Sequence, residues 1–262
     1  MTKAPETEEE KLPFIAVIKQ SFMYFFNNLG LFARVASLGI VVVLFDMFAD
    51  FPTLCAVRGT ECPQNWQQSV STLLLLLVSV SAIIMYCRNV VFKTTAMSWA
   101  SFVRALLLYI VFSVFLVLII AVPSIAVMFL YGVAMPEAGQ HGLMINLLML
   151  VPLLISIAVA PLFLIFPAVA VDDRSFGIRR VFAIARGNHN RIFWGQFLMM
   201  IPCAVVILIL NYAYRFIGVD NYLVNELFLI VVIAFSLVDS CLKASFYAHI
   251  YQFFKARQGT LK

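Results

Sequence analysis

The stretch VDDRSFGIRRVFAIARGNHNRIFWG, residues 171–195, places seven charged residues between two long apolar segments. Because charged residues make up only 12% of the chain, this concentration marks a loop outside the apolar phase. Lys and Arg in short loops stay on the cytoplasmic side of a membrane. We therefore expect this stretch to contain a cytoplasmic loop, which sets the orientation of the segments on either side of it.

The composition of the whole chain agrees with a membrane location. Of its 262 residues, 63% are hydrophobic, and the mean hydropathy is +1.00. A chain this apolar lacks the polar surface that a water-soluble globule needs. Runs of roughly 20 apolar residues or more, long enough to cross a bilayer, recur along it. The sequence predicts an all-α membrane protein with six transmembrane helices, at about residues 30–49, 69–92, 103–133, 143–171, 191–217 and 224–252.

The predicted organisation is one six-helix membrane domain, residues 12–255, between two short cytoplasmic tails, residues 1–11 and 256–262. The first tail is polar and acidic, so we expect it to be disordered. It lacks the basic and apolar parts of a cleavable signal, so the first span is expected to act as the insertion signal. The fourth span should be the most irregular, because it contains Pro152, Pro161 and Pro167.

Positive charge is distributed unequally between the two predicted sides. Of the 18 Lys and Arg residues, 16 fall on or toward one side, and only Arg58 and Arg215 fall on the other. The positive-inside rule assigns the first side, with both termini, to the cytoplasm. We expect a multi-pass protein of the bacterial cytoplasmic (inner) membrane. This topology accounts for the net charge of +5 without a nucleic-acid partner.

The charged loop also has a helical pattern. Ile178, Val181, Phe182 and Ala185 follow i, i+3, i+4, i+7 spacing, which predicts a basic amphipathic helix that ends at residues 187–188. We expect this elbow helix to lie in the headgroup plane with its apolar side down. The candidates for contact with anionic lipid headgroups are Arg179, Arg180 and Arg186. The alternative is a solvated loop that only sets the topology.

A similar elbow occurs near the start of the chain. IKQSFMYFFNN, residues 18–28, aligns without gaps on IRRVFAIARGN, residues 178–188, and pairs Lys19 with Arg179. Lys19 is therefore a further headgroup candidate. An elbow at residues 94–104 would complete an internal repeat of three units, each made of an elbow and two spans. The alternative is that helices followed by turns have converged on similar composition.

Two segments resemble a known family. They are LIFPAVAVDDRSFGIRRVFAIARGNHNRIFWG, residues 164–195, and the Tyr-rich, basic SFYAHIYQFFKAR, residues 245–257. They resemble the membrane domain attached to some glycerophosphoryl diester phosphodiesterases, which also stands alone in uncharacterised bacterial inner-membrane proteins. The resemblance covers about residues 12–255 and implies six helices. It does not imply phosphodiesterase activity, which resides in a separate soluble domain of those relatives.

The sequence offers no catalytic motif. It has no phosphate-binding GxxxxGK[ST] loop, no HExxH zinc pair and no GxSxG nucleophile elbow. Its three histidines, His141, His189 and His249, are not clustered with the carboxylates that a metal-dependent phosphodiesterase needs. We therefore expect neither an enzyme nor a bound cofactor or metal.

Ionisable residues inside the predicted spans are the main site candidates, because placing charge in a bilayer is costly. Asp239 and Lys243 lie one helical turn apart in the sixth span and can pair. The pair either holds helices together or serves as a relay or polar substrate contact. Asp46 lies near the outer end of the first span, where it can reach water or cap a loop. His249, near the inner end of the sixth span, is open to the same two interpretations as the pair.

The five cysteines divide by location. Cys55 and Cys62 lie in a predicted outer loop, where an oxidising periplasm would permit a disulfide between them. The alternative is two free thiols. The other three lie in spans and are expected to be small apolar filler: Cys87, Cys203 and Cys241.

These observations leave two hypotheses for function. The first is a non-enzymatic membrane protein for membrane organisation, lipid interaction or membrane-protein assembly, with anionic lipid and membrane proteins as partners. The second is a transporter or permease subunit with a polar path near Asp239 and Lys243. A transporter should contain a polar cavity that reaches Asp239, whereas a scaffold should have a dry, packed interior.

Overall fold

The computed structural model describes residues 11–48, 66–134, 154–155, 157–217 and 222–260, with only the backbone at some helix ends. These residues form helices and connecting segments, without a β-strand among them. In chain order the elements are α1 (Phe14–Asn27), α2 (Leu29–Phe48), α4 (Trp66–Phe92), α5 (Trp99–Ala134), the 3-10 helix η3 (Ala160–Leu164), α7 (Ile165–Ala170), α8 (Ile178–Ile184), α9 (His189–Ile217) and α10 (Tyr222–Thr260).

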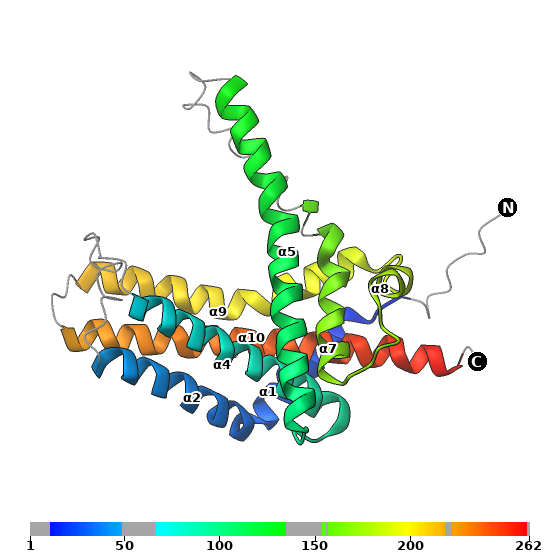
Figure 1. Cartoon of the computed structure of the whole chain (residues 1–262), viewed down its shortest axis with the longest axis horizontal. Helices are drawn as coiled ribbons and strands as arrows, with labels where there is room; N and C mark the ends of the chain where they lie inside the picture. Colours follow the sequence, from blue (N-terminus) through cyan, green and yellow to red (C-terminus); the bar gives the residue numbers. More distant parts are fainter. Residues whose placement is uncertain (1–10, 49–65, 135–153, 156, 218–221, 261–262) are drawn as a thin grey trace.

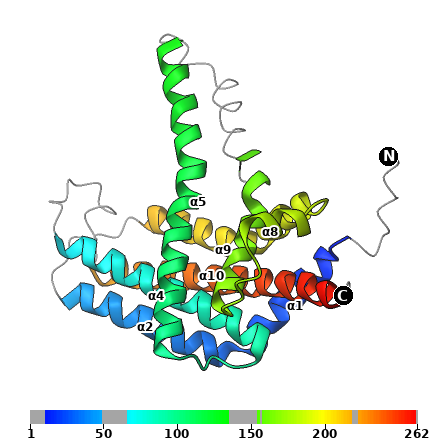
Figure 2. The same cartoon turned by 45° about the vertical axis from the view of Figure 1, so that its right-hand side comes forward.

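Helix α10 is the centre of the fold. It packs against α1, α2, α4 and α9, and it runs alongside the last three in a bundle (Figure 1). Helix α5 crosses this bundle and extends beyond it in both views (Figures 1 and 2). Helix α5 therefore runs in a different direction from the bundle helices.

In the described part of the chain, four helices are long and apolar enough to cross a membrane: Leu73–Phe92, Trp99–Pro123, His189–Leu210 and Ile230–Arg257. A fifth span results if α1 and the first part of α2, which meet at a bend of 71°, are taken together. The all-helical prediction is confirmed, and the chain has the character of a multi-pass membrane protein. Six spans are not found among the described residues.

The structure and the six-span prediction differ in the fourth predicted span. Its described part is a short apolar helix, Ile157–Ala170, which includes the 3-10 turn η3. Pro161 and Pro167 lie in this part and remove backbone donors, so the expected irregularity is present. Residues 143–153 lie outside the described part.

At the C-terminal end of the chain, α10 continues to Thr260, so most of the predicted tail at 256–262 is helical.

The surface of the bundle is suited to an apolar surrounding. Large apolar side chains are exposed along α5 and α9, among them Val111, Val117, Leu208 and Ile209. A water-soluble monomer rarely exposes so continuous an apolar surface. The buried core lies where α4 and α10 meet α7, with Tyr86, Phe246 and Tyr251 fully enclosed.

The elbow predictions are partly correct. Helix α8 forms within the expected loop, but Val181 and Ala185 are fully buried, so this part of its apolar face packs inside the protein and not on lipid. Helix α1 likewise buries Val17, Ser21 and Phe25. The third elbow is not found: residues 94–98 are not helical, and α5 begins directly at Trp99. The internal repeat of three units is therefore not found.

Candidate functional site

Asp239 and Lys243 form the pair that their spacing on α10 predicts. Lys243 Nζ donates a hydrogen bond to Asp239 Oδ2 at 2.6 Å. The side chain of Lys243 is 25% exposed and that of Asp239 is 20% exposed. An ion pair with so little access to water contributes little net stability, because desolvation offsets much of the attraction between the charges.

A cavity of about 150 Å³ lies beside this pair. Helices α4, α5, α7, α9 and α10 and the 3-10 helix η3 all contribute to its wall. Its polar lining comes from Tyr109, Gln196, Ser240 and Tyr247 together with the pair, and its remaining wall is apolar apart from Cys87. The cavity therefore lies at the place where α5 crosses the bundle.

Two buried polar atoms at this cavity have no hydrogen-bond partner. They are Asp239 Oδ1 and the Tyr247 hydroxyl, and both residues line the cavity. The carboxylate oxygen can only accept a hydrogen bond, whereas the hydroxyl can donate or accept one. Burying an unpaired polar group costs about 1–3 kcal/mol. The site therefore combines an ion pair with unused hydrogen-bonding capacity.

The size of the cavity limits its occupant. Sites for drug-sized ligands occupy roughly 300–1,000 Å³, whereas one water takes about 30 Å³ in the liquid. The cavity can hold a few waters or one small solute. Within the described part of the chain, no group of three or more His, Cys, Asp or Glu side chains could hold a metal ion.

Of the other candidates inside the predicted spans and the outer loop, only His249 has a described side chain, and it does not line this cavity. His249 lies on α10 with Nδ1 2.7 Å from the Ser245 carbonyl oxygen, and its ring contacts Tyr24 of α1 edge to face. Asp46 falls in the part of α2 whose side chains are not described. Cys55 and Cys62 lie outside the described residues, so their disulfide stays a prediction.

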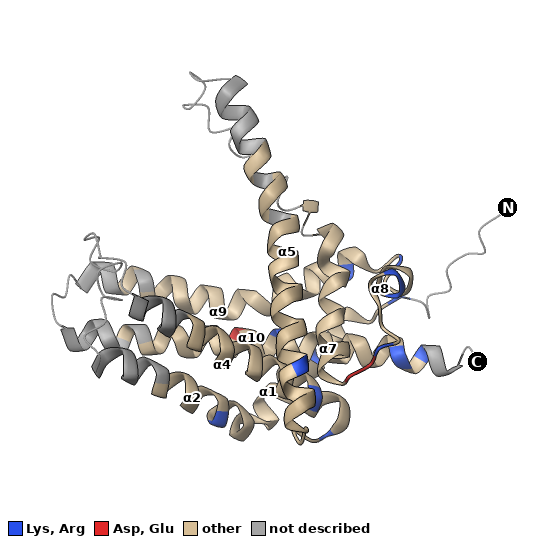
Figure 3. Cartoon of the chain, in the orientation of Figure 1, with Lys and Arg blue, Asp and Glu red and all other residues tan. Residues whose placement is uncertain are grey.

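The headgroup candidates are all exposed: Lys19, Arg179, Arg180 and Arg186. Arg180 also donates a hydrogen bond to the Ser175 carbonyl oxygen at 3.1 Å. Figure 3 shows that Lys and Arg gather around α8, the first turns of α5 and the C-terminal end of α10. The fold therefore brings the basic residues of α8 and of the C-terminal end of α10, which are distant in the sequence, to the same end of the molecule.

A polar cluster around Asp173 was not predicted from the sequence. Asp173 Oδ2 accepts hydrogen bonds from the Tyr251 hydroxyl at 2.5 Å and from Lys255 Nζ at 3.0 Å. Its Oδ1 accepts two more from Ser175. Burial alone would raise the pKa of Asp173, but the bonds from Ser175, Tyr251 and Lys255 outweigh burial and hold that pKa well below its usual range. The cluster ties the loop after α7 to α10.

Replacing Asp173 with Asn should lower the free energy of unfolding by about 1–2 kcal/mol at pH 7, because it weakens hydrogen bonds to a charged acceptor. The folded-state pKa is depressed, so the carboxylate stabilises the parent above about pH 4, its unfolded-state pKa. That stability is lost progressively as the pH falls from about 4 toward the folded-state value. Unfolding in detergent between pH 7 and pH 3 should therefore show the difference shrinking.

Asp172→Asn is the matched control, because Asp172 is the neighbouring carboxyl and is half exposed. It should change stability by less than about 0.5 kcal/mol. A difference between Asp173→Asn and the parent that stays constant down to pH 3 would contradict the assigned role of the carboxylate.

The fold and site define a class: a chain whose described residues form a helical protein with four or five apolar helices long enough to span a membrane and a polar pair inside the bundle. Comparisons with protein-family models, curated proteins and solved structures found no match for this chain. The resemblance to the phosphodiesterase-linked membrane domain therefore stays a prediction.

Proposed function

We propose that this chain is a polytopic membrane protein that binds a small hydrogen-bonding solute inside its helix bundle, as a permease subunit does. The observation that supports the proposal is the cavity beside Asp239 and Lys243, where Asp239 Oδ1 and the Tyr247 hydroxyl lack partners. A purely structural pair does not require such atoms, and each is costly. A solute that supplies the missing hydrogen bonds would offset that cost.

The groups at the cavity define the chemistry of the solute. Asp239 and Lys243 together carry no net charge, so the site favours an uncharged or zwitterionic solute over an ion. The solute should donate a hydrogen bond to Asp239 Oδ1 and exchange one with the Tyr247 hydroxyl. The apolar remainder of the wall, which includes Phe163 and Phe166, suits a short hydrocarbon part. The proposal involves no catalytic step.

The same proposal assigns an orientation. The basic end of the molecule would face the cytoplasm of a bacterium, in its inner membrane, by the positive-inside rule. The start of α1 lies at this end, because Leu12 N–H donates to Asn188 Oδ1 at 2.8 Å and Arg191 donates to the Leu12 carbonyl oxygen at 2.7 Å. The end of α10 is tied to the same region through Lys255 and Asp173. Both termini would then be cytoplasmic.

Interaction with anionic lipid is the second candidate function. It is favoured by the exposed arginines of the α8 region, which lie at the basic end of the molecule. Membrane-surface charges of this kind attract anionic headgroups at about 1 kcal/mol each. This function does not require the cavity, so the two candidates can be tested separately.

Access of water-soluble molecules to the cavity tests the first proposal. Ser240 lines the cavity, whereas Leu242, two residues along α10, is buried outside it. In a variant without the five native cysteines, Ser240→Cys should react with a small charged methanethiosulfonate at least about tenfold faster than Leu242→Cys. The reagent reacts with the thiolate form of cysteine, and a thiolate forms readily only where water reaches the side chain. Equal rates at the two positions would contradict a solute site.

Ligand screening provides the second readout. Any solute that binds the folded state raises the unfolding temperature. A panel of small amino acids and polyols should contain one that stabilises the parent in detergent but not a variant lacking both Asp239 and Lys243. Stabilisation of both proteins to the same extent would place the solute elsewhere.

A further inference from the structure

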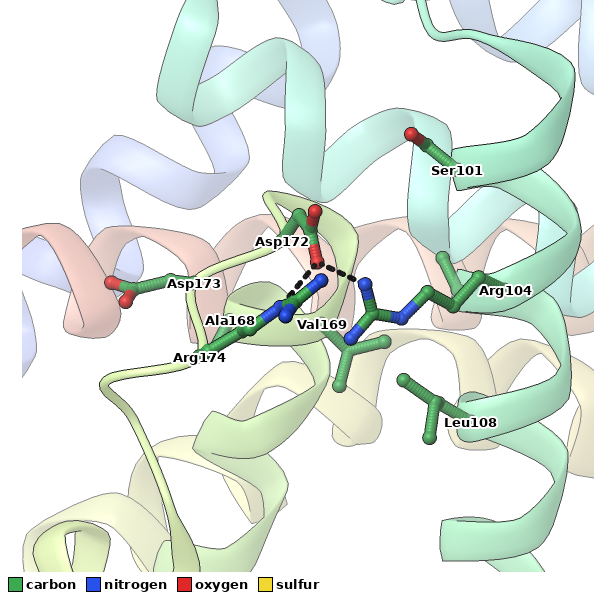
Figure 4. Close-up of a pocket in the computed structure, with 9 residues that line it drawn as sticks. Ser101, Arg104, Leu108, Ala168, Val169, Asp172, Asp173 and Arg174 are labelled. Atoms are coloured by element: carbon green, nitrogen blue, oxygen red, sulfur yellow. Dashed lines mark ion pairs between the residues drawn. The ribbon is translucent and has the colours of Figure 1, made fainter.

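A second pocket lies between the first turns of α5 and the loop that follows α7. Its volume is about 80 Å³, and its polar lining comes from Ser101, Arg104, Asp172, Asp173 and Arg174. Figure 4 shows Arg104 and Arg174 approaching Asp172 from two different elements. The pocket is far smaller than a drug-sized site, so it suits one compact charged group.

The two arginines share one carboxylate oxygen. Arg104 Nη1 lies 3.3 Å and Arg174 Nε lies 3.9 Å from Asp172 Oδ1. The side chains of Arg104 and Arg174 are 45% and 75% exposed. Each guanidinium has five N–H donors, so a single shared oxygen leaves most of them available to an additional acceptor.

The charged side chains at the pocket and its edge are three basic and two acidic, once Lys255, which pairs with Asp173, is included. Two arginines face Asp172, whereas the neighbouring Asp173 is engaged by Tyr251 and Lys255. Asp172 has a backbone φ of +56°, a left-handed conformation that Asp tolerates better than most residues. This turn places the Asp172 carboxylate between the two arginines, so both guanidinium groups face the same carboxylate oxygen. An anion with several oxygens would match this arrangement better than the single shared oxygen does.

An apolar face continues from the pocket along α5. Arg104, Leu108, Val111 and Phe115 follow i, i+4, i+7, i+11 spacing, so they lie on one side of the helix. The last three are exposed. Trp99, exposed and stacked on Phe102, begins the helix, where an aromatic side chain marks the boundary between headgroups and acyl chains. The charged pocket and the exposed apolar face of α5 are therefore adjacent, in the order that a headgroup and an acyl chain require.

We propose that this pocket binds the phosphate of an anionic phospholipid, with Arg104 and Arg174 as its ligands and an acyl chain along Leu108, Val111 and Phe115. Guanidinium groups bind phosphate through paired, charge-assisted hydrogen bonds, and the Ser101 hydroxyl can donate one more. Asp172 competes with the phosphate for the same donors. The proposal gives the second candidate function a specific site and is independent of the cavity at Asp239.

Lipid binding to the detergent-solubilised protein tests the site. Native mass spectrometry with added phosphatidylglycerol or phosphatidylcholine should show preferential binding of the anionic lipid. Arg104→Gln/Arg174→Gln should weaken phosphatidylglycerol binding about tenfold, since two charges near a headgroup are removed. Lys11→Gln/Arg34→Gln removes the same charge from exposed positions outside the pocket and should weaken it less than about threefold. Equal losses in the two double variants would overturn the proposal.

Asp172→Asn provides a test that misfolding cannot imitate. It removes the competing carboxylate, and Asn also tolerates the left-handed backbone, so phosphatidylglycerol binding should become about threefold tighter. Unchanged or weaker binding would overturn the proposal. Millimolar inorganic phosphate, added as a competitor, distinguishes a lipid phosphate from free phosphate as the ligand of the pocket. Failure to displace the lipid supports a lipid site, whereas complete displacement would overturn the acyl-chain part and leave a site for free phosphate.

Discussion

Replacing Asp239 alone with Asn, or Lys243 alone with Met, is expected to lower the free energy of unfolding by about 3 kcal/mol. Each change removes one partner of an ion pair whose side chains are 20–25% exposed, so the remaining charge has poor access to water. Removing one partner of a buried pair is far more destabilising than the pair itself is stabilising. The Asp239→Asn/Lys243→Met variant, which leaves no stranded charge, should recover most of the loss.

The four proteins form a double-mutant cycle whose interaction energy can be measured by denaturant or thermal unfolding in detergent. Arg174→Gln is the control, because its ion pair with Asp172 is well exposed and should contribute less than about 0.5 kcal/mol. A double variant as unstable as the single ones would contradict the account of the pair. The cycle also separates structure from function: a stable double variant that still responds to a solute of the parent would contradict the proposed solute site.

Replacing Gly195 with Val is the second change with a large expected effect, a loss of about 3 kcal/mol or failure to fold. A Cβ atom at this position of α9 would lie 2.8 Å from Cε2 of Phe246 and closer still to Cζ. Phe246 is fully buried, so its ring has little room to move. Forcing extra atoms into such a packed contact typically costs 1–3 kcal/mol or more.

Gly30→Ala is the matched control, because a Cβ there would meet no atom within 4 Å. It should be neutral or slightly stabilising, since Ala is a better helix former than Gly. Phe246→Leu should restore part of the stability of Gly195→Val by making room for the added methyl groups. Thermal unfolding of the three variants and the combined one checks this prediction, and a Gly195→Val protein as stable as the parent would contradict it.

Features that depend on neighbouring residues could be predicted well. The pairing of Asp239 with Lys243 follows from their positions on one helix, because i and i+4 side chains lie side by side whatever surrounds the helix. The long apolar runs at residues 69–92, 103–133, 191–217 and 224–252 were correctly interpreted as helices. The prolines at positions 161 and 167 correctly indicated irregular helix, since each removes a backbone donor regardless of tertiary packing.

Features that depend on contacts between distant segments could not be predicted. The apolar spacing of Val181 and Ala185 identified a helix face, but periodicity does not show whether lipid or protein covers that face; here it is protein. The hydrogen bond from Tyr251 to Asp173 joins residues 78 positions apart. The one available signal was the acidic pair at residues 172–173 together with Tyr251 and Lys255 spaced i, i+4, and it does not specify which carboxylate they contact.

The sequence by itself determined the all-helical class, the membrane character and the ion pair on α10, because composition and helical periodicity act within single segments. Only the tertiary structure decided that α5 crosses the bundle, that a cavity forms beside Asp239, and that Arg104 and Arg174 meet at Asp172. The physical reason is that hydropathy reports how much apolar surface a helix must cover and carries no information on its direction. Direction is set by the shapes of packed side chains from several helices at once.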